Sequence, residues 1–368
     1  MRLGLIFGGK SGEHEVSVRS GHAVWKASVK AGFDVVGIGI TRAGEFLYLG
    51  DCVDFFGTDP QEVRPCEEPA RFPKCFILPD PTRPGIYLED STAFRIQVDA
   101  IFPVLHGSYG EDGAIQGLLE LSGIPYVGAP VLGSAVCMDK DTTKRLLATH
   151  GVPHVPALTV ERFEWQSERQ DTLSYLCRAA TFPAFVKPSG SGSSLGVTKV
   201  KTPDGLADAL DVAFLYDTKA LVEPSQEDLM EIECAVLGNA EPRASVPGQI
   251  LPRREFYDYD AKYVEDTTDL IIPAPLDPDT TKEVQQVAVQ AFRATGCRGM
   301  ARVDFFVGPM KGEVYVNELN TIPGFTSISM YPKMWEASGL HFHELVKSLV
   351  DLAIEQKRAA WKEVIVRR

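Results

Sequence analysis

The chain has 368 residues, more than a single typical domain, so two or three domains are expected. Its formal net charge of −13 argues against nucleic-acid binding, which needs clustered lysine and arginine. No apolar run reaches the roughly 18 residues of a membrane span, the short apolar start lacks a signal-peptide cleavage pattern, and the seven scattered cysteines lack paired spacing. We therefore expect a soluble cytoplasmic protein with reduced thiols that binds neither nucleic acid nor a membrane.

The start of the chain predicts a strand, a glycine-rich turn, a helix and a second strand, at 3–7, 8–12, 15–31 and 35–40. This order is typical of an open parallel α/β sheet, which binds ligands at the carboxyl ends of its strands. The turn lacks the Gly-x-Gly-x-x-Gly spacing of a dinucleotide site. The segment carries two carboxylates, Glu13 and Glu15, and such a pair suits a substrate ammonium better than a phosphate. Glu15 has a second interpretation as a helix-start residue favoured by the helix dipole.

The next part of the chain predicts irregular structure followed by a glycine-rich loop. Residues 51–90 are rich in proline and glycine, with a hairpin expected near 74–87. A strand at 99–104 leads into the loop HGSYGEDG at 106–113. A single histidine is more often structural than functional, but the glycines put His106 on a tight loop at a strand end, which favours a functional role.

A second glycine-rich loop follows a strand that ends at Lys187 and Pro188 and has the sequence SGSGSSLGV. Small residues let backbone N–H groups and hydroxyls surround phosphates. The loop is not a Walker loop, because the Gly-Lys-Ser/Thr ending is missing, and a flexible linker is the alternative interpretation. The Lys-Pro lead-in and the Leu-Gly-Val exit into another strand favour a hairpin flap.

The rest of the chain predicts mixed strands and helices. A domain boundary is expected near 131–139, and the aromatic and charged segment EFYDYDAKY at 255–263 predicts a loop. Further strands are expected at 220–223 and 232–236. The remaining predicted helices lie at 114–122, 142–150, 206–213 and 343–356.

Two strands near the C-terminus, MARVDFF and EVYVNELN, carry polar residues at period-two spacing. Alternation puts Arg302 with Asp304 on one face, and Glu318 with Asn320 on one face. Glycines and a proline between the strands predict a hairpin. Pairing would gather three oxygen ligands beside one cation, a set that suits Mg²⁺ with water and substrate phosphates completing its coordination. A solvated polar strand face is the alternative.

These strands and the loops GGKSGEHEVS, HGSYGEDG and KPSGSGSSLGV resemble the corresponding motifs of the ATP-grasp ligases, and within them the D-alanine–D-alanine ligases. The matches run in family order from Gly8 to Ser329, across nearly the whole chain. The resemblance implies an α/β fold of the α+β ATP-grasp type with three domains. These are an N-terminal open parallel α/β sheet for substrate binding at 1–135, and two ATP-grasp subdomains, at 136–222 with the phosphate loop and at 223–368 with the metal site and a lid loop.

The resemblance also implies an activity. The family joins two D-alanines to D-alanyl-D-alanine through a D-alanyl phosphate, for peptidoglycan precursor synthesis. The implied cofactors are ATP and Mg²⁺ or Mn²⁺, with two ions, and D-alanine is both substrates. A homodimer is expected from the family alone.

For the substrates, the resemblance implies that Glu13 holds the ammonium of the first D-alanine and that His106 lies near its carboxylate. Ser329 matches the residue on the carboxylate of the second D-alanine, and Ser327 belongs to the same loop. Tyr263 favours the dipeptide product, because relatives that make a D-alanyl-D-lactate ester typically depart from tyrosine here.

For the nucleotide, the resemblance implies that Lys187 lies near the α- and β-phosphates and that Lys140 is a second nucleotide lysine. Lys262, on a mobile lid, would reach the transferred phosphate. Glu231 resembles the ribose carboxylate, although Glu233, on the same strand face, is an alternative. The other implied nucleotide contacts are Ser193, Ser194 and Glu223, the last beside the adenine ring.

For the chemistry, the resemblance implies that the metal is held by Asp304, Glu318 and Asn320. Arg302 and the N–H of Gly324 would stabilise the tetrahedral oxyanion formed when the second amine attacks. Closure of the lid would protect the acyl phosphate from water.

The attacking ammonium must first lose a proton, and no residue in the sequence is an obvious base. The family offers one candidate group, formed by Glu13, Ser193 and Tyr263.

Three other functions are compatible with parts of the sequence. Another ATP-grasp ligase would share the metal residues and the Lys187 loop, but the His106 and Ser329 loops favour D-alanine. A Rossmann-type oxidoreductase predicts an acidic residue at the end of the second strand, whereas Asp34 precedes that strand. A non-catalytic nucleotide sensor would need no metal ligands, yet all three are present.

Overall fold

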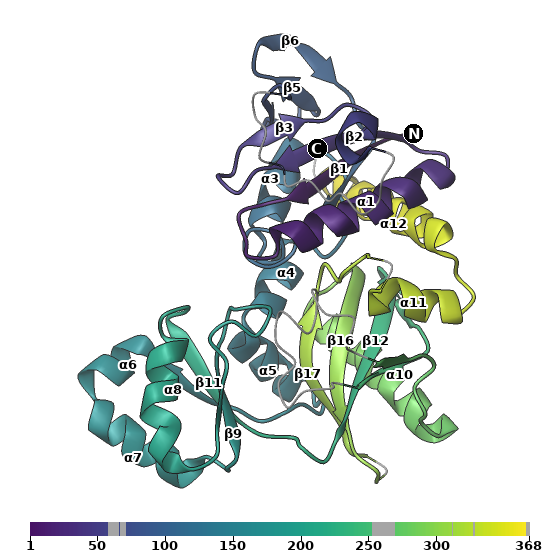
Figure 1. The fold of residues 1–368 in the computed structure, drawn as a ribbon. Coiled ribbons are helices and arrows are strands. Elements are labelled where there is room, and N and C mark those ends of the chain that lie inside the picture. Colours follow the sequence, from purple (N-terminus) through teal and green to yellow (C-terminus); the bar gives the residue numbers. More distant parts are fainter. Residues whose placement is uncertain (58–65, 67–70, 252–268, 311, 327, 366–368) are drawn as a thin grey trace.

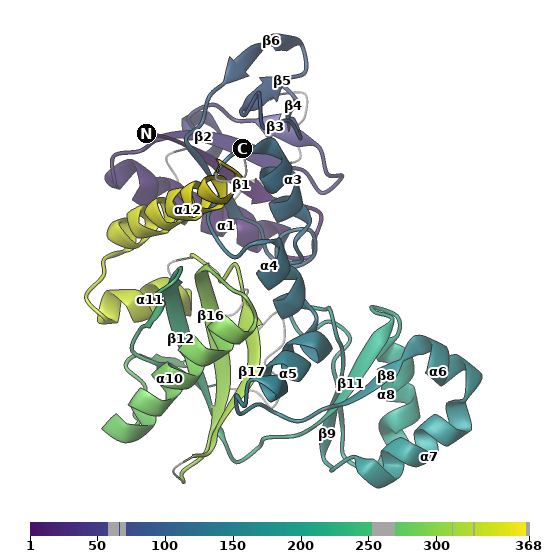
Figure 2. The ribbon, with the colours of Figure 1, turned by 180° about the vertical axis from the view of Figure 1, so that it is seen from behind.

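The computed structural model describes residues 1–57, 66, 71–251, 269–310, 312–326 and 328–365. In this part of the chain the strands form four sheets, and Figures 1 and 2 show them in three groups. Among the helices of this described part, none combines the length and apolar character needed to cross a bilayer.

The N-terminal sheet has the order β3-β2-β1-β7. Strand β1 pairs in parallel with β2 and β7, as the sequence predicts, and β3 adds an antiparallel edge. Leucines and a phenylalanine of β1 face one core, while its Ile6 faces another, so the sheet is covered on both sides. The strands and the helix between the first two are β1 (Arg2–Gly8), α1 (His14–Lys30), β2 (Asp34–Ile40), β3 (Phe46–Tyr48) and β7 (Ala100–Val104).

A small antiparallel sheet, β4-β5-β6, stands beside the N-terminal sheet. Its first two strands form the hairpin predicted near 74–87, and the third was not predicted. The elements of this part are α2 (Val53–Phe56), β4 (Cys75–Ile77), β5 (Ile86–Leu88), β6 (Ser91–Ile96) and α3 (Ala114–Ser122).

Helices α4 (Val131–Met138) and α5 (Lys140–Thr149) connect the N-terminal sheet to the rest of the molecule (Figure 2). The side chain of Asp139 accepts a hydrogen bond from the N–H of Thr142 and so caps α5. This break between two short helices lies where the sequence predicts a boundary.

The central sheet has the order β10-β9-β11-β8 and is covered by helices on one side. Strands β9 and β10 are antiparallel, so the glycine-rich loop between them is the tip of a hairpin, as predicted. The elements are β8 (Leu158–Glu161), α6 (Arg162–Ser167), α7 (Arg169–Ala179), β9 (Ala184–Pro188), β10 (Thr198–Val200), η1 (Pro203–Gly205), α8 (Leu206–Ala213) and β11 (Lys219–Pro224).

The C-terminal sheet has the order β15-β14-β12-β16-β17, with β13 paired to β12. Helix α10 covers one of its faces through a core of valine, alanine and phenylalanine. The elements are β12 (Met230–Gly238), β13 (Arg243–Ala244), β14 (Gly248–Leu251), β15 (Asp269–Ile271), α10 (Pro278–Ala294), β16 (Gly299–Val307), β17 (Val314–Asn320) and α11 (Met330–Ala337).

The last helix, α12 (Phe342–Ile365), is longer than the predicted 343–356 and returns to the start of the chain. It packs against α1 and β7, and its apolar residues share one core with β1 and α1. Both views show the yellow α12 beside the purple N-terminal elements.

Candidate active site

A cavity of about 1040 Å³ lies where the N-terminal, central and C-terminal sheets meet. Every candidate residue that the structure describes contributes to its lining. These residues are Glu13, His106, Lys140, Lys187, Ser193, Ser194, Glu223, Glu231, Arg302, Asp304, Glu318, Asn320, Gly324 and Ser329. The other three candidates, Lys262, Tyr263 and Ser327, lie outside the described residues.

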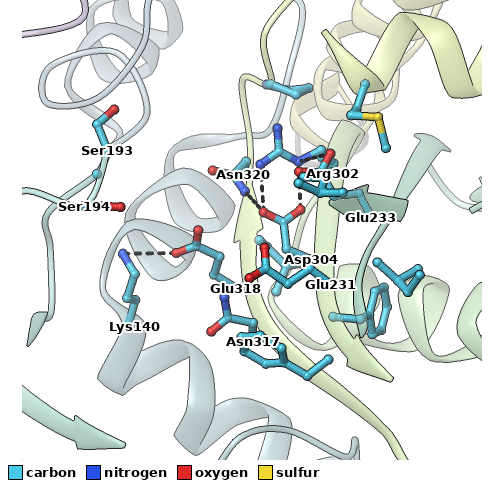
Figure 3. A pocket seen from close by; sticks show the side chains of 18 of the residues that line it. Lys140, Ser193, Ser194, Glu231, Glu233, Arg302, Asp304, Asn317, Glu318 and Asn320 are labelled. Carbon is cyan, nitrogen blue, oxygen red and sulfur yellow. Dashed lines mark hydrogen bonds and ion pairs between the residues drawn. The ribbon is translucent and has the colours of Figure 1, made fainter. Parts of the chain in front are cut away.

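The hairpin of β16 and β17 gathers the polar residues that alternation predicts to share a face. Asp304 is opposite Glu318, and Arg302 is opposite Asn320. Two nitrogens of Arg302 donate to Asp304, each at 2.7 Å, and the amide of Asn320 donates to Asp304 at 2.9 Å (Figure 3). Arg302 is also 3.1 Å from Glu233 on β12. The predicted hairpin and the shared face are therefore confirmed.

A β-bulge in β17 adds a residue to this face that alternation alone does not predict. Asp304 pairs with Glu318 and the next residue, Phe305, pairs with Val316, so Asn317 is the extra residue. The bulge keeps Val316 in the core while both Asn317 and Glu318 line the cavity. The oxygen of Asn317 accepts from Lys187 at 3.5 Å, the long limit of a hydrogen bond.

The oxygen ligands on the hairpin fit a hard divalent cation. Within the described part of the chain, no three His, Cys, Asp or Glu side chains converge to hold a metal by themselves. The hairpin offers two carboxylates, Asp304 and Glu318, and the amide oxygen of Asn320. Mg²⁺ is usually held by one or two carboxylates, with waters and substrate phosphates as its other ligands. Both carboxylates already face protein cations, Arg302 and Lys140, so this face attracts positive charge.

The glycine-rich flap closes the opposite side of the cavity. Lys140 donates to the carbonyl of Ser191 in the flap at 2.8 Å and reaches Glu318 at 3.3 Å, so it spans the cavity (Figure 3). Ser193 and Ser194 have φ of 49° and 58°, left-handed conformations that side-chain-bearing residues rarely adopt. The flap thus presents a backbone conformation typical of ligand-binding loops.

Ser193 also connects the flap to the N-terminal sheet. Its hydroxyl donates to Glu13 at 2.5 Å. Glu13 is buried, and its N–H donates to the hydroxyl of Ser11, which in turn donates to the carbonyl of His106. The pairing of Glu13 with Ser193 brings together two members of the candidate proton-transfer group.

His106 is buried, and both of its ring nitrogens have protein partners. Nδ1 is 3.0 Å from the carbonyl of Ile322 and therefore carries the hydrogen, while Nε2 is 3.0 Å from the hydroxyl of Ser20. Burial lowers the pKa of His106, despite the opposing effect of Glu13, so the ring is neutral at physiological pH. His106 thus links the strand-end loop to the loop that follows β17.

Glu111 makes a second link between the same two loops. Its carboxylate accepts from the N–H of Gly107 at 2.9 Å and from the N–H of Ile322 at 3.1 Å. Burial, reinforced by the nearby Glu13, raises the pKa of Glu111 to about 7.

The loop after β17 ends at the start of α11. Ser329 precedes the helix, and its hydroxyl accepts from the N–H of Thr326 at 3.0 Å. A Cβ at Gly324 would lie 2.7 Å from that hydroxyl, so any larger residue would displace it. Lys333, one turn into α11, also lines the cavity.

The two candidates for the ribose contact differ in their surroundings. Glu233 is buried and ion-paired with Arg302. Glu231 is partly exposed and is the second residue of β12, opposite Phe306.

Several cavity residues were not among the sequence candidates. Glu111 lies inside the loop HGSYGEDG and Asn317 inside the strand EVYVNELN. Both therefore belong to segments that the sequence predicts to form the site. Lys333 belongs to no such segment. Lys144, behind the cavity wall, follows Lys140 by four residues, which places both on one face of a helix.

Comparisons with known proteins agree with this geometry. Residues 2–129 match the family model described as D-ala D-ala ligase N-terminus, and residues 146–351 match D-ala D-ala ligase C-terminus. The D-alanine–D-alanine ligase of Caldicellulosiruptor bescii is 45% identical over 360 residues, covering 97% of this chain and 96% of the relative. The chain therefore belongs to the D-alanine–D-alanine ligase family.

Two solved structures have the same fold over nearly their whole length. The D-alanine–D-alanine ligase of Coxiella burnetii superposes with a TM-score of 0.83 at 38% identity, covering 100% of this chain and 99% of that one. The VanG D-Ala:D-Ser ligase of Enterococcus faecalis has the same TM-score at 36% identity, covering 96% and 99%. The predicted mixed α/β fold is confirmed by these matches.

Proposed function

We propose that this chain is an ATP-dependent ligase that joins two D-alanines into D-alanyl-D-alanine for peptidoglycan precursor synthesis. One observation carries the proposal. The carboxylates and the amide of the β16–β17 hairpin face Lys140 and Lys187 across one cavity, and Glu13 and Ser193 form its third side. This arrangement brings together the ligands for a metal, for phosphates and for an amino acid.

The reaction needs an activated carboxylate, because amide formation from a free carboxylate is uphill in water. Phosphoryl transfer from ATP would convert the carboxylate of the first D-alanine to an acyl phosphate and release ADP, and two divalent ions, Mg²⁺ or Mn²⁺, would offset the phosphate charge. Asp304, Glu318 and Asn320 would hold the metal. The protein contributes position and charge, which make up most of the catalysis in phosphoryl transfer.

The nucleotide is held between the flap and the C-terminal sheet. Lys140 and Lys187 neutralise phosphates, with Lys262 from the lid, and the hydroxyls and N–H groups of Ser193 and Ser194 solvate them. The partly exposed position of Glu231 supports the ribose contact there, because Glu233 is buried.

The first D-alanine is held by the N-terminal loops. Glu13 binds its ammonium and His106 lies near its carboxylate. Since both ring nitrogens of His106 bond to protein atoms, the histidine acts by ordering its loop. Glu13, Ser193 and Tyr263 form the group that receives the proton from the second ammonium.

The second D-alanine is held at the start of α11. The hydroxyl of Ser329 and the N-terminal end of this helix suit its carboxylate, with Ser327 in the same loop. Arg302 and the N–H of Gly324 stabilise the oxyanion as the amine attacks.

The proposal also covers the assembly and location of the protein. We propose a cytoplasmic homodimer with domains at 1–135, 136–222 and 223–368. Light scattering of the purified protein would give the mass of the assembly. Limited proteolysis would test whether cleavage falls near the two boundaries.

The deciding experiment is release of phosphate from ATP and Mg²⁺ with D-alanine, against L-alanine and D-lactate controls, with the product mass recorded. Release with D-alanine alone and the mass of the dipeptide are expected. Absence of D-alanine-dependent release from folded, ATP-binding protein would contradict the proposal and point to another carboxylate–amine pair.

A mixture of D-alanine and D-serine tests a second candidate. The VanG D-Ala:D-Ser ligase is 36% identical to this chain, so D-serine is a candidate second substrate. Preferential formation of D-alanyl-D-serine from an equimolar mixture would favour that activity.

A further inference from the structure

Lys144 is a buried lysine that lies behind the wall of the candidate nucleotide site. It follows Lys140 by one helical turn on α5, but its side chain is only 6% exposed and does not line the cavity. Its ammonium lies 3.1 Å from Glu223 and donates to the carbonyl of Val155 at 2.9 Å. A buried ammonium costs free energy unless it is paired, so its partners account for its position.

Glu223 is shared between two lysines. One of its oxygens faces Lys144, and the other lies 2.7 Å from Lys187. The carboxylate is 5% exposed, so water does not screen either pair appreciably. Burial alone would raise the pKa of Glu223, but Lys187 and Lys144 together hold it below its ordinary value. The carboxylate is therefore ionised and bound to both cations.

The charges of this cluster decide what Lys187 can offer to a ligand. Two lysines and one carboxylate leave one net positive charge at the edge of the cavity. Without Lys144, Glu223 would neutralise Lys187 alone, and the pair would offer no net charge to a phosphate. Lys187 is the residue of this cluster that belongs to the strand leading into the flap.

We propose that Lys144 is a positioning residue for the nucleotide phosphates: it balances Glu223, so that the charge of Lys187 remains available to them. This inference rests on the proposed function only in taking a nucleotide as the ligand. It also gives Glu223 an electrostatic role, in addition to the contact with adenine that the family resemblance implies.

The pH dependence of the cluster gives the proposal a distinctive signature. Burial lowers the pKa of Lys144 to about 8, against the opposing attraction of Glu223. The charged groups that face it are Glu223 on β11, Lys187 on β9 and Glu318 on β17. As the pH rises through about 8, Lys144 loses its proton and the cluster loses its net positive charge.

The first test is the dissociation constant for Mg·ATP, and for adenosine by competition, measured by calorimetry without D-alanine. Lys144→Met should weaken ATP binding at least about tenfold, the cost of losing a charged partner, and leave adenosine binding nearly unchanged. Arg145→Met removes an exposed cation from the next position of the same helix, where it pairs with Asp141, and serves as the matched control. It should bind ATP as the unaltered protein does.

The double variant Lys144→Met/Glu223→Gln separates charge from structure. The loss of Glu223 leaves Lys187 with one net positive charge, so the variant should regain affinity for the phosphates. The measure of this affinity is the dissociation constant for adenosine divided by that for ATP. Equal loss of ATP and adenosine binding in Lys144→Met, with no recovery in the double variant, would overturn the proposal. ATP binding equal to that of the Arg145→Met control would overturn it too.

A pH series on the unaltered protein keeps the test independent of any variant that fails to fold. The dissociation constant for ATP should rise as the pH passes about 8, and adenosine should show no such rise. Lys144→Met should lack this dependence. A flat profile in the unaltered protein contradicts the role of Lys144, whereas failure of D-alanine-dependent phosphate release contradicts the ligase function instead.

Discussion

Arg302, on the hairpin face, makes ionic contacts with two carboxylates. Two of its nitrogens bond to Asp304, and one of them, Nε, also lies 3.1 Å from Glu233, so the guanidinium is held in one orientation. A donor fixed before the reaction stabilises developing charge without the cost of reorganisation. The contacts therefore support the role in oxyanion stabilisation that the family implies.

We expect Arg302→Ala to lower the turnover of D-alanine about 100- to 1,000-fold, the usual cost of a lost oxyanion donor. Steady-state kinetics with saturating ATP would measure it. Arg298→Ala, an exposed arginine just before the same strand, is the control and should be near normal. Near-normal turnover in a folded Arg302→Ala variant would remove Arg302 from the mechanism.

Glu111 gives a prediction about pH and stability. Its pKa is about 7 in the folded protein against an ordinary value of 4.5, so between these values the folded state binds more protons than the unfolded state. The contribution of Glu111 to the free energy of unfolding therefore falls as the pH rises from 4.5 to 7, by up to about 3 kcal/mol.

Glu111→Gln cannot titrate and escapes this loss. The difference in melting temperature, variant minus unaltered protein, should increase from pH 4.5 to 7 and then stay constant. Thermal unfolding at several pH values would measure the difference. A difference that does not change with pH would show that Glu111 titrates normally.

The bulge in β17 is the feature of local structure that shapes the site. Alternation along the strand would put Val316, Glu318 and Asn320 on one face, yet Val316 lies in the core. The extra residue, Asn317, reverses the alternation between them. The strand can thus bury Val316 and still present Glu318 and Asn320 to the cavity.

Two deletions test this account of the strand. Removing Asn317 should leave Glu318 and Asn320 on the cavity face, so Mg²⁺-dependent ATP binding should persist, with a loss of about 1–3 kcal/mol in stability. Removing Leu319 should turn Asn320 into the core and abolish that binding. Binding measurements with and without Mg²⁺ would compare them. Loss of binding in both would show that the bulge itself is required.

The sequence predicts the hairpin and its shared face because period-two alternation is a property of the strands themselves. The bulge was not predicted: the interval between core residues changes from two to three after Val316, but one such change in a short strand does not identify a bulge. The roles of Glu111 and Lys144 were also missed, because they depend on Ile322 and Glu223, which lie far away in the chain. Local patterns identify a face or a loop but not its distant partner.

At the scale of the whole molecule, α12 packs against α1 and β7 of the N-terminal sheet. Its buried leucines and valines join the core formed by α1 and β1, at the opposite end of the chain. The amphipathic pattern predicts a closing helix, but it does not identify the surface on which the helix packs. Leu349 is 1% exposed and lies in this shared core.

We expect Leu349→Ala to lower the free energy of unfolding by about 2–5 kcal/mol, since it removes buried methyl groups and leaves a cavity. Urea unfolding would measure the change. Lys347→Ala, at an exposed position of the same helix, should change stability little. An equally small effect of Leu349→Ala would mean that α12 adds little to this core.

The position of α12 has a consequence for synthesis on the ribosome. The strands of the N-terminal sheet emerge before residues 345–353, which complete one of its cores. During translation, that apolar face therefore stays uncovered while the central and C-terminal sheets form, and nascent chains need protection there from aggregation. Emergence of α12, rather than of the first strands, is the event that completes this core.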